Sequence, residues 1–527
     1  MILLCAIILL SCLIASRFSD KIGMPALLLF MALGMIFGSD GLFKISFDNY
    51  IVTEKICNVA LIFIMFYGGF GTKWSVAKPV AKKSICLSTV GVVITAGLSS
   101  LFCIYVLKFD TLEAFLIGAV ISSTDAASVF SILRSKNLSL KEGTSSMLEI
   151  ESGSNDPAAY MFTVLILQAM KGSNNLFEIG GMIIAQVVFG ILVGVCVAKA
   201  GLFVIQRTKI VDDGLESIFM ITLVLISYSL AESLGGNGYL SVYLTGIILG
   251  NSKIKNKIVL VHFFDGITGL AQILIFFLLG LLAFPHKLPA IIIPSILIAL
   301  FLTFVARPIA VFSILLPFKS SIRQCMLVSW SGLRGAASIV FAIMAMAQGT
   351  NMKYDLFHIV FMISLLSVAF QGSLLPYVSR KLDMVDEEND VKKTFTDYQE
   401  DSALTLMRVF IPEGHPWDNK TIEKAGIPSD FLALIIKRDG ETIIPKGDTL
   451  IKTNDSIVFS VPEYNSKDDI KLSEIDINKT HKWKNKTIEE LNLPDNILVA
   501  LIKRGEQNII PRGKTKILED DVVVIYN

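Results

Sequence analysis

Features that mark nucleic-acid-binding proteins and nucleotide-driven pumps are missing from this sequence of 527 residues. Its 47 basic residues are balanced by 46 acidic ones, so the net charge of +1 gives no sign of a nucleic-acid partner. The seven cysteines all precede residue 326 and have no metal-ligand spacing, which favours small buried apolar residues. Gly513-Lys-Thr does not complete a phosphate-binding loop, because residue 508 is Asn. We therefore expect neither an enzyme nor a resident cofactor.

Charge is scarce before residue 382 and dense after it. Long apolar runs separated by short charged loops predict a membrane-embedded domain over residues 1–381, surrounded by lipid. Hydropathy suggests about thirteen spans of roughly the length that a bilayer requires. They are expected near 1–16, 25–39, 56–71, 84–107, 112–134, 143–170, 177–204, 215–234, 238–251, 259–284, 289–317, 322–347 and 355–379.

The loops predict the orientation. Most Lys and Arg residues of the connecting loops follow odd-numbered spans, and few follow even-numbered ones. By the positive-inside rule, the odd loops and the C-terminal region are cytoplasmic and the N-terminus faces outward. We expect a multi-pass protein of the cytoplasmic membrane.

Two predicted spans are interrupted at corresponding positions. Polar and charged residues stand in mid-span at Ser122-Ser-Thr-Asp125 and at Trp330-Ser-Gly-Leu-Arg334. If span 177–204 separates two halves of six spans, each interrupted span is the fifth of its half, and the halves have opposite topology. The predicted fold class is an all-α membrane domain with inverted repeats and crossed broken helices, which favours transport.

A carboxylate at bilayer depth is costly, so it usually serves a proton or an ion. Asp156 lies in Glu151-Ser-Gly-Ser-Asn155-Asp156-Pro157, where we expect the proline to break the helix. An unwound helix offers carbonyl oxygens, the hydroxyl of Thr124 adds another oxygen, and hard cations prefer oxygen. Asp156 can bind a cation as a carboxylate and release it when protonated. Asp125 either ligates the cation or neutralises the dipoles of the half-helices. An intramembrane hydrolase that uses Asp125 and Asp156 is an alternative function, but the paired interruptions favour transport.

Glu151 and Arg334 are two further charges inside predicted spans. Because single buried charges are expensive, they are expected to pair with each other across the two halves. An internal brace is favoured over a direct part in coordination.

The C-terminal region contains an internal repeat. After an acidic linker at 382–401, Trp417-Asp-Asn-Lys-Thr-Ile-Glu423 matches Trp483-Lys-Asn-Lys-Thr-Ile-Glu489, and Ile443-Ile-Pro-Lys-Gly447 matches Ile509-Ile-Pro-Arg-Gly513. With two copies of this period, paired small domains are more plausible than a solenoid. We expect two small α+β regulatory domains, 402–466 and 467–527, each with a short helix followed by strands.

The three membrane motifs together resemble the signatures of monovalent cation/proton antiporters of the NhaP type, especially the potassium/proton branch, over roughly residues 1–380. The resemblance implies electroneutral exchange of one cation, K⁺ favoured and Na⁺ the alternative, for one proton. It also implies a homodimer in which a core domain moves like an elevator against a dimerisation domain.

By the same resemblance, Asp156 is the acid that binds ion and proton, Asn155 orients the site and Glu151 pairs with Arg334. The residues around the ion and proton are expected to be Asp156, Asp125, Thr124, Ser152 and Asn155, with Asp156, Thr124 and Ser152 as the ligands of the cation. Some relatives also place an acid on the third helix; Ile56–Phe70 has none, and Tyr67 is the nearest polar residue there.

The repeat resembles the RCK C-terminal, or TrkA C-terminal, domain of potassium-transport proteins. Such domains pair, and their interface binds small nucleotides such as cyclic di-AMP. Lys437, Arg438, Lys503 and Arg504 recur in register and either meet phosphates or lie at solvated strand ends. A potassium channel regulated by such domains is the alternative function, but the Thr-Val-Gly-Tyr-Gly type of carbonyl filter is missing.

Overall fold

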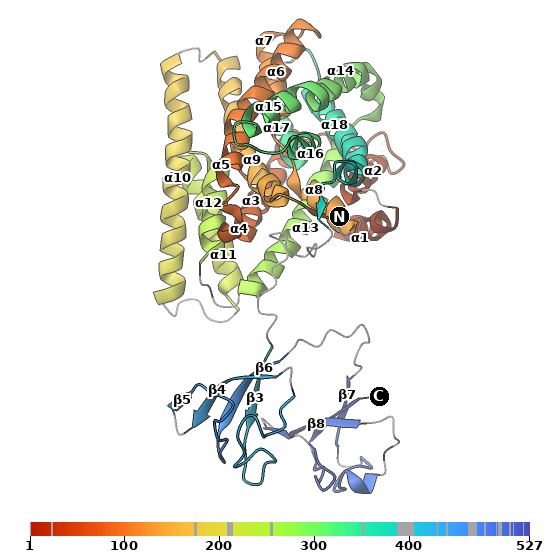
Figure 1. Cartoon of the computed structure of the whole chain (residues 1–527). Helices are drawn as coiled ribbons and strands as arrows, with labels where there is room; N and C mark the ends of the chain where they lie inside the picture. Colours follow the sequence, from red (N-terminus) through yellow and green to blue (C-terminus); the bar gives the residue numbers. More distant parts are fainter. Residues whose placement is uncertain are drawn as a thin grey trace. The chain divides into compact units, whose positions relative to one another are not determined.

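The structure is a computed structural model of the whole chain, shown in Figure 1. It describes all residues except 1, 23–24, 137, 173–175, 208–213, 253, 255–256, 350–351, 387–404, 429–430, 439–440, 462–471, 479–480, 492, 494–497, 505–506, 510, 520 and 527. The chain divides into two compact units, Met1–Gln399 and Glu400–Asn527. Most of the predicted linker 382–401 lies outside the described residues.

The first unit is helical, and Figure 1 shows its helices gathered into one bundle. Its helices, with η marking π- or 3₁₀-helical segments, are α1 (Ile2–Ile22), α2 (Ala26–Phe37), α3 (Tyr50–Gly71), α4 (Trp74–Ala77), α5 (Ala81–Cys86), η1 (Leu87–Gly91), α6 (Val92–Tyr105), α7 (Thr111–Val120), α8 (Ala126–Ser135), α9 (Thr144–Met170), α10 (Leu176–Arg207), α11 (Glu216–Ser233), α12 (Gly238–Gly250), α13 (Lys257–Leu282), η2 (Pro285–Lys287), α14 (Leu288–Phe301), η3 (Leu302–Ala306), α15 (Arg307–Leu315), α16 (Ile322–Trp330), α17 (Ala336–Ala347), α18 (Leu356–Leu366), η4 (Ser367–Gly372) and α19 (Ser373–Lys381).

Among the described residues, seven helices are long and apolar enough to cross a membrane, and shorter apolar helices accompany them. Most helices overlap the predicted spans, several spans contain more than one segment, and the short α4 and η2 lie between spans. Span 289–317, for example, comprises α14, η3 and α15. The number of spans that cross a membrane stays a prediction.

Both predicted interruptions are present as gaps in a helix. The chain leaves helical geometry between α7 and α8 and again between α16 and α17. The two unwound stretches touch, because the backbone N–H of Asp125 donates to the carbonyl of Leu333 at 2.8 Å. A side chain on Gly335 would collide with the carboxylate of Asp125, so glycine permits this close approach.

The expected break at Pro157 is wrong. Helix α9 runs without interruption from Thr144 to Met170, with Pro157 inside it. Proline removes one backbone donor, but packing against neighbouring helices keeps a membrane helix intact around it. One such contact is the side-chain amide of Asn237, which donates to the Pro157 carbonyl at 2.8 Å.

Two short strands tie the end of the first unit to the loop after α8. Strand β1 (Ser139–Leu140) pairs antiparallel with β2 (Val385–Asp386). Beside this pairing, the carboxylate of Asp383 forms ion pairs with Lys141 at 3.0 Å and with Arg323 at 2.9 Å. The hydrogen bond and charge of Lys141 hold the pKa of Asp383 below its usual value. The loops after α8 and α15 and the segment after α19 therefore meet on one side of the bundle.

The second unit contains two antiparallel sheets of four strands with the same topology. The first has the order β3 (Thr405–Phe410), β6 (Ser456–Val461), β4 (Leu432–Arg438), β5 (Glu441–Ile443). The second has the order β7 (Leu472–Asp476), β10 (Val522–Tyr526), β8 (Leu498–Arg504), β9 (Gln507–Ile509). The repeat therefore encodes two copies of one sheet, and the sequence missed the first strand of each.

The expected short helix of each copy is not α-helical in the described residues. The first copy has turns and an isolated bridge between Thr421 and Leu450, and the second has a 3₁₀ turn, η6 (Glu489–Leu491). The described parts of both copies are therefore β structure with turns rather than α+β.

An arginine on a central strand of each sheet holds a buried aspartate. Arg438 makes two hydrogen bonds of 2.7 Å with Asp455, and Arg504 makes two of 2.8 Å with Asp521. Burial alone would raise the pKa of Asp455, but hydrogen bonds from Arg438 and the Lys452 backbone outweigh it, so the pKa lies below its usual value. Such a carboxylate stabilises the fold above the unfolded-state pKa of about 4, and that contribution is lost as the pH falls through the folded-state value.

We predict that Asp455→Asn lowers the local unfolding free energy of the first sheet by about 1.5–3 kcal/mol, because Arg438 loses its charged acceptor. Amide hydrogen exchange of the full chain at neutral pH measures this. Strands β4 and β6 should exchange faster, while β8 and β10 keep the wild-type rate. Asp521→Asn is the matched control and should give the reverse pattern. Unchanged exchange of β4 in Asp455→Asn would show that the pair does not stabilise the sheet.

Candidate functional site

The site centres on Asp156, which lies in α9 beside the unwound stretch between α7 and α8. Its side chain is 5% exposed, and its Oδ1 accepts a hydrogen bond from the hydroxyl of Ser123. Asp156 lines a cavity of about 460 Å³. A buried carboxylate that reaches a cavity can take up a proton or a cation from it.

Two polar side chains of α9 hold the unwound backbone in place. The hydroxyl of Ser152 donates to the Thr124 carbonyl at 2.8 Å and accepts from the Ala126 N–H at 3.0 Å. The side-chain amide of Asn155 donates to the hydroxyl of Thr124, and both residues are buried. Ser152 also lines the cavity. The structure therefore brings together the five residues predicted around the ion, namely Asp156, Asp125, Thr124, Ser152 and Asn155.

Asp125 caps the second half of the interrupted helix. Its carboxylate accepts from the backbone N–H of Ser128 at 3.2 Å and from the hydroxyl of the same residue. An acid at a helix N-terminus compensates the positive end of the helix dipole. Asp125 also lines the cavity, so its geometry is compatible with both of its predicted roles.

The predicted pair of Glu151 and Arg334 is wrong. Glu151 forms its ion pair with Arg307, at 2.6 Å between Oε1 and Nη1. The Nη1 of Arg334 instead donates to the carbonyls of Ser122 at 2.9 Å and Ser123 at 2.6 Å. An unwound stretch leaves carbonyl oxygens without helical partners, and a buried guanidinium satisfies them. The sequence shows three buried charges, but it does not show that the carbonyl oxygens of the unwound stretch bind Arg334 and leave Arg307 to pair with Glu151.

Helix α13 forms the opposite wall of the cavity, which the sequence reading missed. Asp265 lines the cavity and accepts a 3.0 Å hydrogen bond from the hydroxyl of Tyr67. Thr268 and Gln272 follow it along the same wall. The sequence feature that could have located Asp265 is the long apolar run that follows it in α13. An acid so placed lies inside a span, where it is expected to face a cavity.

The cavity offers carboxylate, hydroxyl and amide oxygens, which suit a hard monovalent cation. Arg334 already occupies the carbonyls of Ser122 and Ser123, and the negative charge that a cation meets in the cavity comes from the carboxylates that line it, Asp156 among them. Within the described part of the chain, no group of three or more His, Cys, Asp or Glu residues could hold a metal ion.

The four basic residues predicted at a regulatory ligand are not equivalent. Arg438 and Arg504 hold Asp455 and Asp521 within their own sheets, which makes them structural. Lys437 is exposed at the adjacent position of β4, and Lys503 is half-buried at the matching position of β8. Both arginines are the last residues of their strands and remain partly exposed, and a phosphate at any of the four basic residues stays a prediction.

We predict that Arg307→Gln destabilises the membrane domain by about 3–5 kcal/mol, because Glu151 is left buried without its partner. Thermal unfolding of the purified protein in detergent measures the loss. Adding Glu151→Gln should recover much of it, as the coupled pair of a double-mutant cycle does. The matched control combines Glu151→Gln with Arg334→Gln, where recovery should be smaller. Equal recovery in both cycles would contradict the observed pairing.

Comparisons with known proteins agree with this geometry. The model of the family described as sodium/hydrogen exchanger, transmembrane, matches residues 6–381, and that of the TrkA-C domain matches residues 406–464 and 472–526. The K(+)/H(+) antiporter NhaP of Alkalimonas amylolytica is 31% identical over 463 residues, covering 87% of this chain and 80% of that protein. The K(+)/H(+) antiporter NhaP2 of Shewanella baltica is 32% identical over 447 residues, covering 84% and 77%.

Among solved structures, the sodium proton antiporter MjNhaP1 from Methanocaldococcus jannaschii matches with a TM-score of 0.62 and 25% sequence identity. The match covers 72% of this chain and 99% of that one. These findings confirm the family relationships predicted from the membrane motifs and from the C-terminal repeat. The chain belongs to the sodium/hydrogen exchanger family of membrane proteins and carries a C-terminal TrkA-C region in two copies.

Proposed function

We propose that this protein is a secondary transporter that exchanges a monovalent cation for H⁺ across the cytoplasmic membrane. K⁺ is favoured over Na⁺, because relatives that match most of the chain are named K(+)/H(+) antiporters. The single observation that carries the proposal is Asp156, a buried carboxylate at a cavity beside an unwound helix. No observation favours the alternative of a potassium channel.

One carboxylate is enough to couple the two movements. A buried carboxylate needs a compensating partner, and either a proton or a cation supplies it. Because the two compete for Asp156, one leaves when the other binds, and the exchange is electroneutral. Ser152 and Asn155 keep the unwound backbone around Thr124 in place while the occupant changes.

The cavity of Asp156 is proposed to open to the cytoplasm, with the N-terminus of the chain outside. It is lined by α8 and the first half of α9, whose connecting loop contains Lys141. This loop pairs with the segment after α19 through β1 and β2, so the two must lie on the same side of the membrane. Both are odd-numbered loops, which supports a cytoplasmic position for the TrkA-C domains.

The TrkA-C domains are proposed to regulate the exchange, in a homodimer and in response to a small nucleotide such as cyclic di-AMP. Arg438 and Arg504 are the weaker candidates for its ligands, because buried aspartates hold both. Lys437 and Lys503 are the stronger candidates. The β1–β2 pairing anchors the start of the linker to loops of the membrane domain, which gives regulation a physical route.

We predict that Asp156→Asn abolishes the dissipation of a pH gradient when K⁺ or Na⁺ is added to proteoliposomes, because Asn binds neither ion nor proton as a carboxylate does. Wild-type rates should not change when the membrane potential is clamped, as electroneutral exchange requires. Asp40→Asn, remote from the cavity, is the control and should retain exchange. Persistent exchange by folded Asp156→Asn would remove Asp156 from its role.

We also predict that deleting residues 401–527 preserves exchange while changing its regulation, because the residues lining the cavity all lie in the first unit. Exchange rates of full-length and truncated protein in proteoliposomes, with and without added nucleotide, measure both effects. Complete loss of exchange in correctly inserted truncated protein would contradict independent function of the membrane domain.

A further inference from the structure

Two adjoining cavities lie beyond Asp156, toward the other end of α3 and α9. They have volumes of about 560 and 250 Å³, and Tyr160 and Glu232 line both. The cavity of Asp156 contacts α3 at Ile64–Gly68, whereas the smaller of these two contacts it at Glu54 and Asn58. Ten residues of helix from Asn58 to Gly68 span about 15 Å, so the cavities lie at different depths of the bundle.

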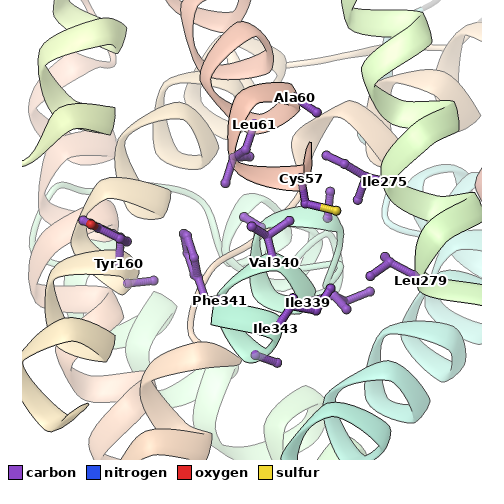
Figure 2. Close-up of a cluster of buried hydrophobic side chains, with 14 of the residues drawn as sticks. Cys57, Ala60, Leu61, Tyr160, Ile275, Leu279, Ile339, Val340, Phe341 and Ile343 are labelled. Atoms are coloured by element: carbon purple, nitrogen blue, oxygen red, sulfur yellow. The ribbon is translucent and has the colours of Figure 1, made fainter. Parts of the chain in front are cut away.

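A layer of buried side chains separates the two regions. Figure 2 shows Leu61, Tyr160, Val340 and Phe341 among them. The rings of Tyr160 and Phe341 lie 5.8 Å apart, and both residues are buried. Tyr160 follows Asp156 by one helical turn and therefore lies between the ion site and the second pair of cavities.

Glu232 is the carboxylate that both outer cavities share. It lies in the last turn of α11 and is half-buried. Its Oε1 accepts from the backbone N–H of Gly238 at 3.0 Å, and the hydroxyl of Tyr160 donates to its two oxygens at 3.3 and 3.4 Å. These bonds hold the Glu232 carboxylate in place where both cavities meet it. Each cavity has one further acid, Glu178 in the larger and Glu54 in the smaller, and its other lining residues are neutral.

An independent observation points to a ligand in the larger cavity. Gln186 lines it, is 6% exposed, and its side-chain Oε1 has no hydrogen-bond partner. A buried acceptor left without a partner is costly. A cation coordinated by Gln186 and Glu232 would satisfy this oxygen, whereas an anion would be repelled by the carboxylates.

We propose that Glu232 and Gln186 form a second, weak binding site for a monovalent cation, at the outer mouth of the transport path. The inference rests on the proposed exchange function and on its orientation. A site made of the Glu232 carboxylate and the neutral Gln186 oxygen attracts a monovalent cation yet allows it to leave, as a transport path requires.

Side-specific kinetics test the site. Right-side-out vesicles present K⁺ to the outer face, and everted vesicles present it to the cytoplasmic face. For Glu232→Gln we expect the half-saturating K⁺ concentration at the outer face to rise about tenfold, the lower end of the concentrating effect of a charged cleft. The value at the cytoplasmic face should stay at the wild-type level. Glu216→Gln, at the opposite end of α11, is the matched control and should leave the outer value unchanged.

Gln186→Glu keeps the proposal falsifiable if Glu232→Gln does not fold. The added carboxylate should lower the half-saturating outer K⁺ concentration, which a structural role for Gln186 would not do. An unchanged outer value in Gln186→Glu, or equal shifts at both faces in Glu232→Gln, would overturn the outer site. Wild-type vesicles without any exchange would instead overturn the proposed function.

Discussion

A backbone that leaves its helix inside a membrane has to satisfy its polar groups without water, and the membrane domain is arranged around that requirement. Between α7 and α8, Arg334 takes the carbonyls of Ser122 and Ser123, and Ser152 takes that of Thr124. The Asp125 N–H reaches the second unwound stretch at Leu333. Each partner comes from elsewhere in the chain, so the local unwinding depends on the crossing of two distant segments.

This arrangement leaves Asp156 as a charge whose partner can be exchanged. Two other buried charges near it have fixed partners, since Glu151 meets Arg307 and Arg334 meets backbone oxygens. Asp156 receives a hydroxyl donor from Ser123 and faces a cavity. In the proposed exchange, these fixed pairs maintain the fold while Asp156 serves proton and cation in turn.

The two sides of Asp156 differ in how closely side chains pack against it. The cavity toward α8 reaches Asp156, whereas Tyr160 and Phe341 belong to a buried layer on the other side. Glu232 accepts the hydroxyl of Tyr160, so the outer carboxylate and the closing aromatic layer are physically linked.

Much of this organisation was readable in the sequence. Apolar runs determined the helical membrane domain, the 417–423 and 483–489 repeat determined two equivalent C-terminal copies, and three motifs identified the family and Asp156. Helix-breaking residues with charge in mid-span also located both unwound stretches, because such residues are tolerated in lipid only for a local structural reason.

Tertiary structure alone decided which groups meet. A sequence shows that Glu151, Arg307 and Arg334 are buried charges, but ion pairing depends on which backbone oxygens compete for each arginine. It shows Pro157, but neighbouring helices decide that α9 continues through it. It shows Asp265 and Glu232 near span ends, but only packing makes them line cavities, because burial and access are set by helices distant in the chain.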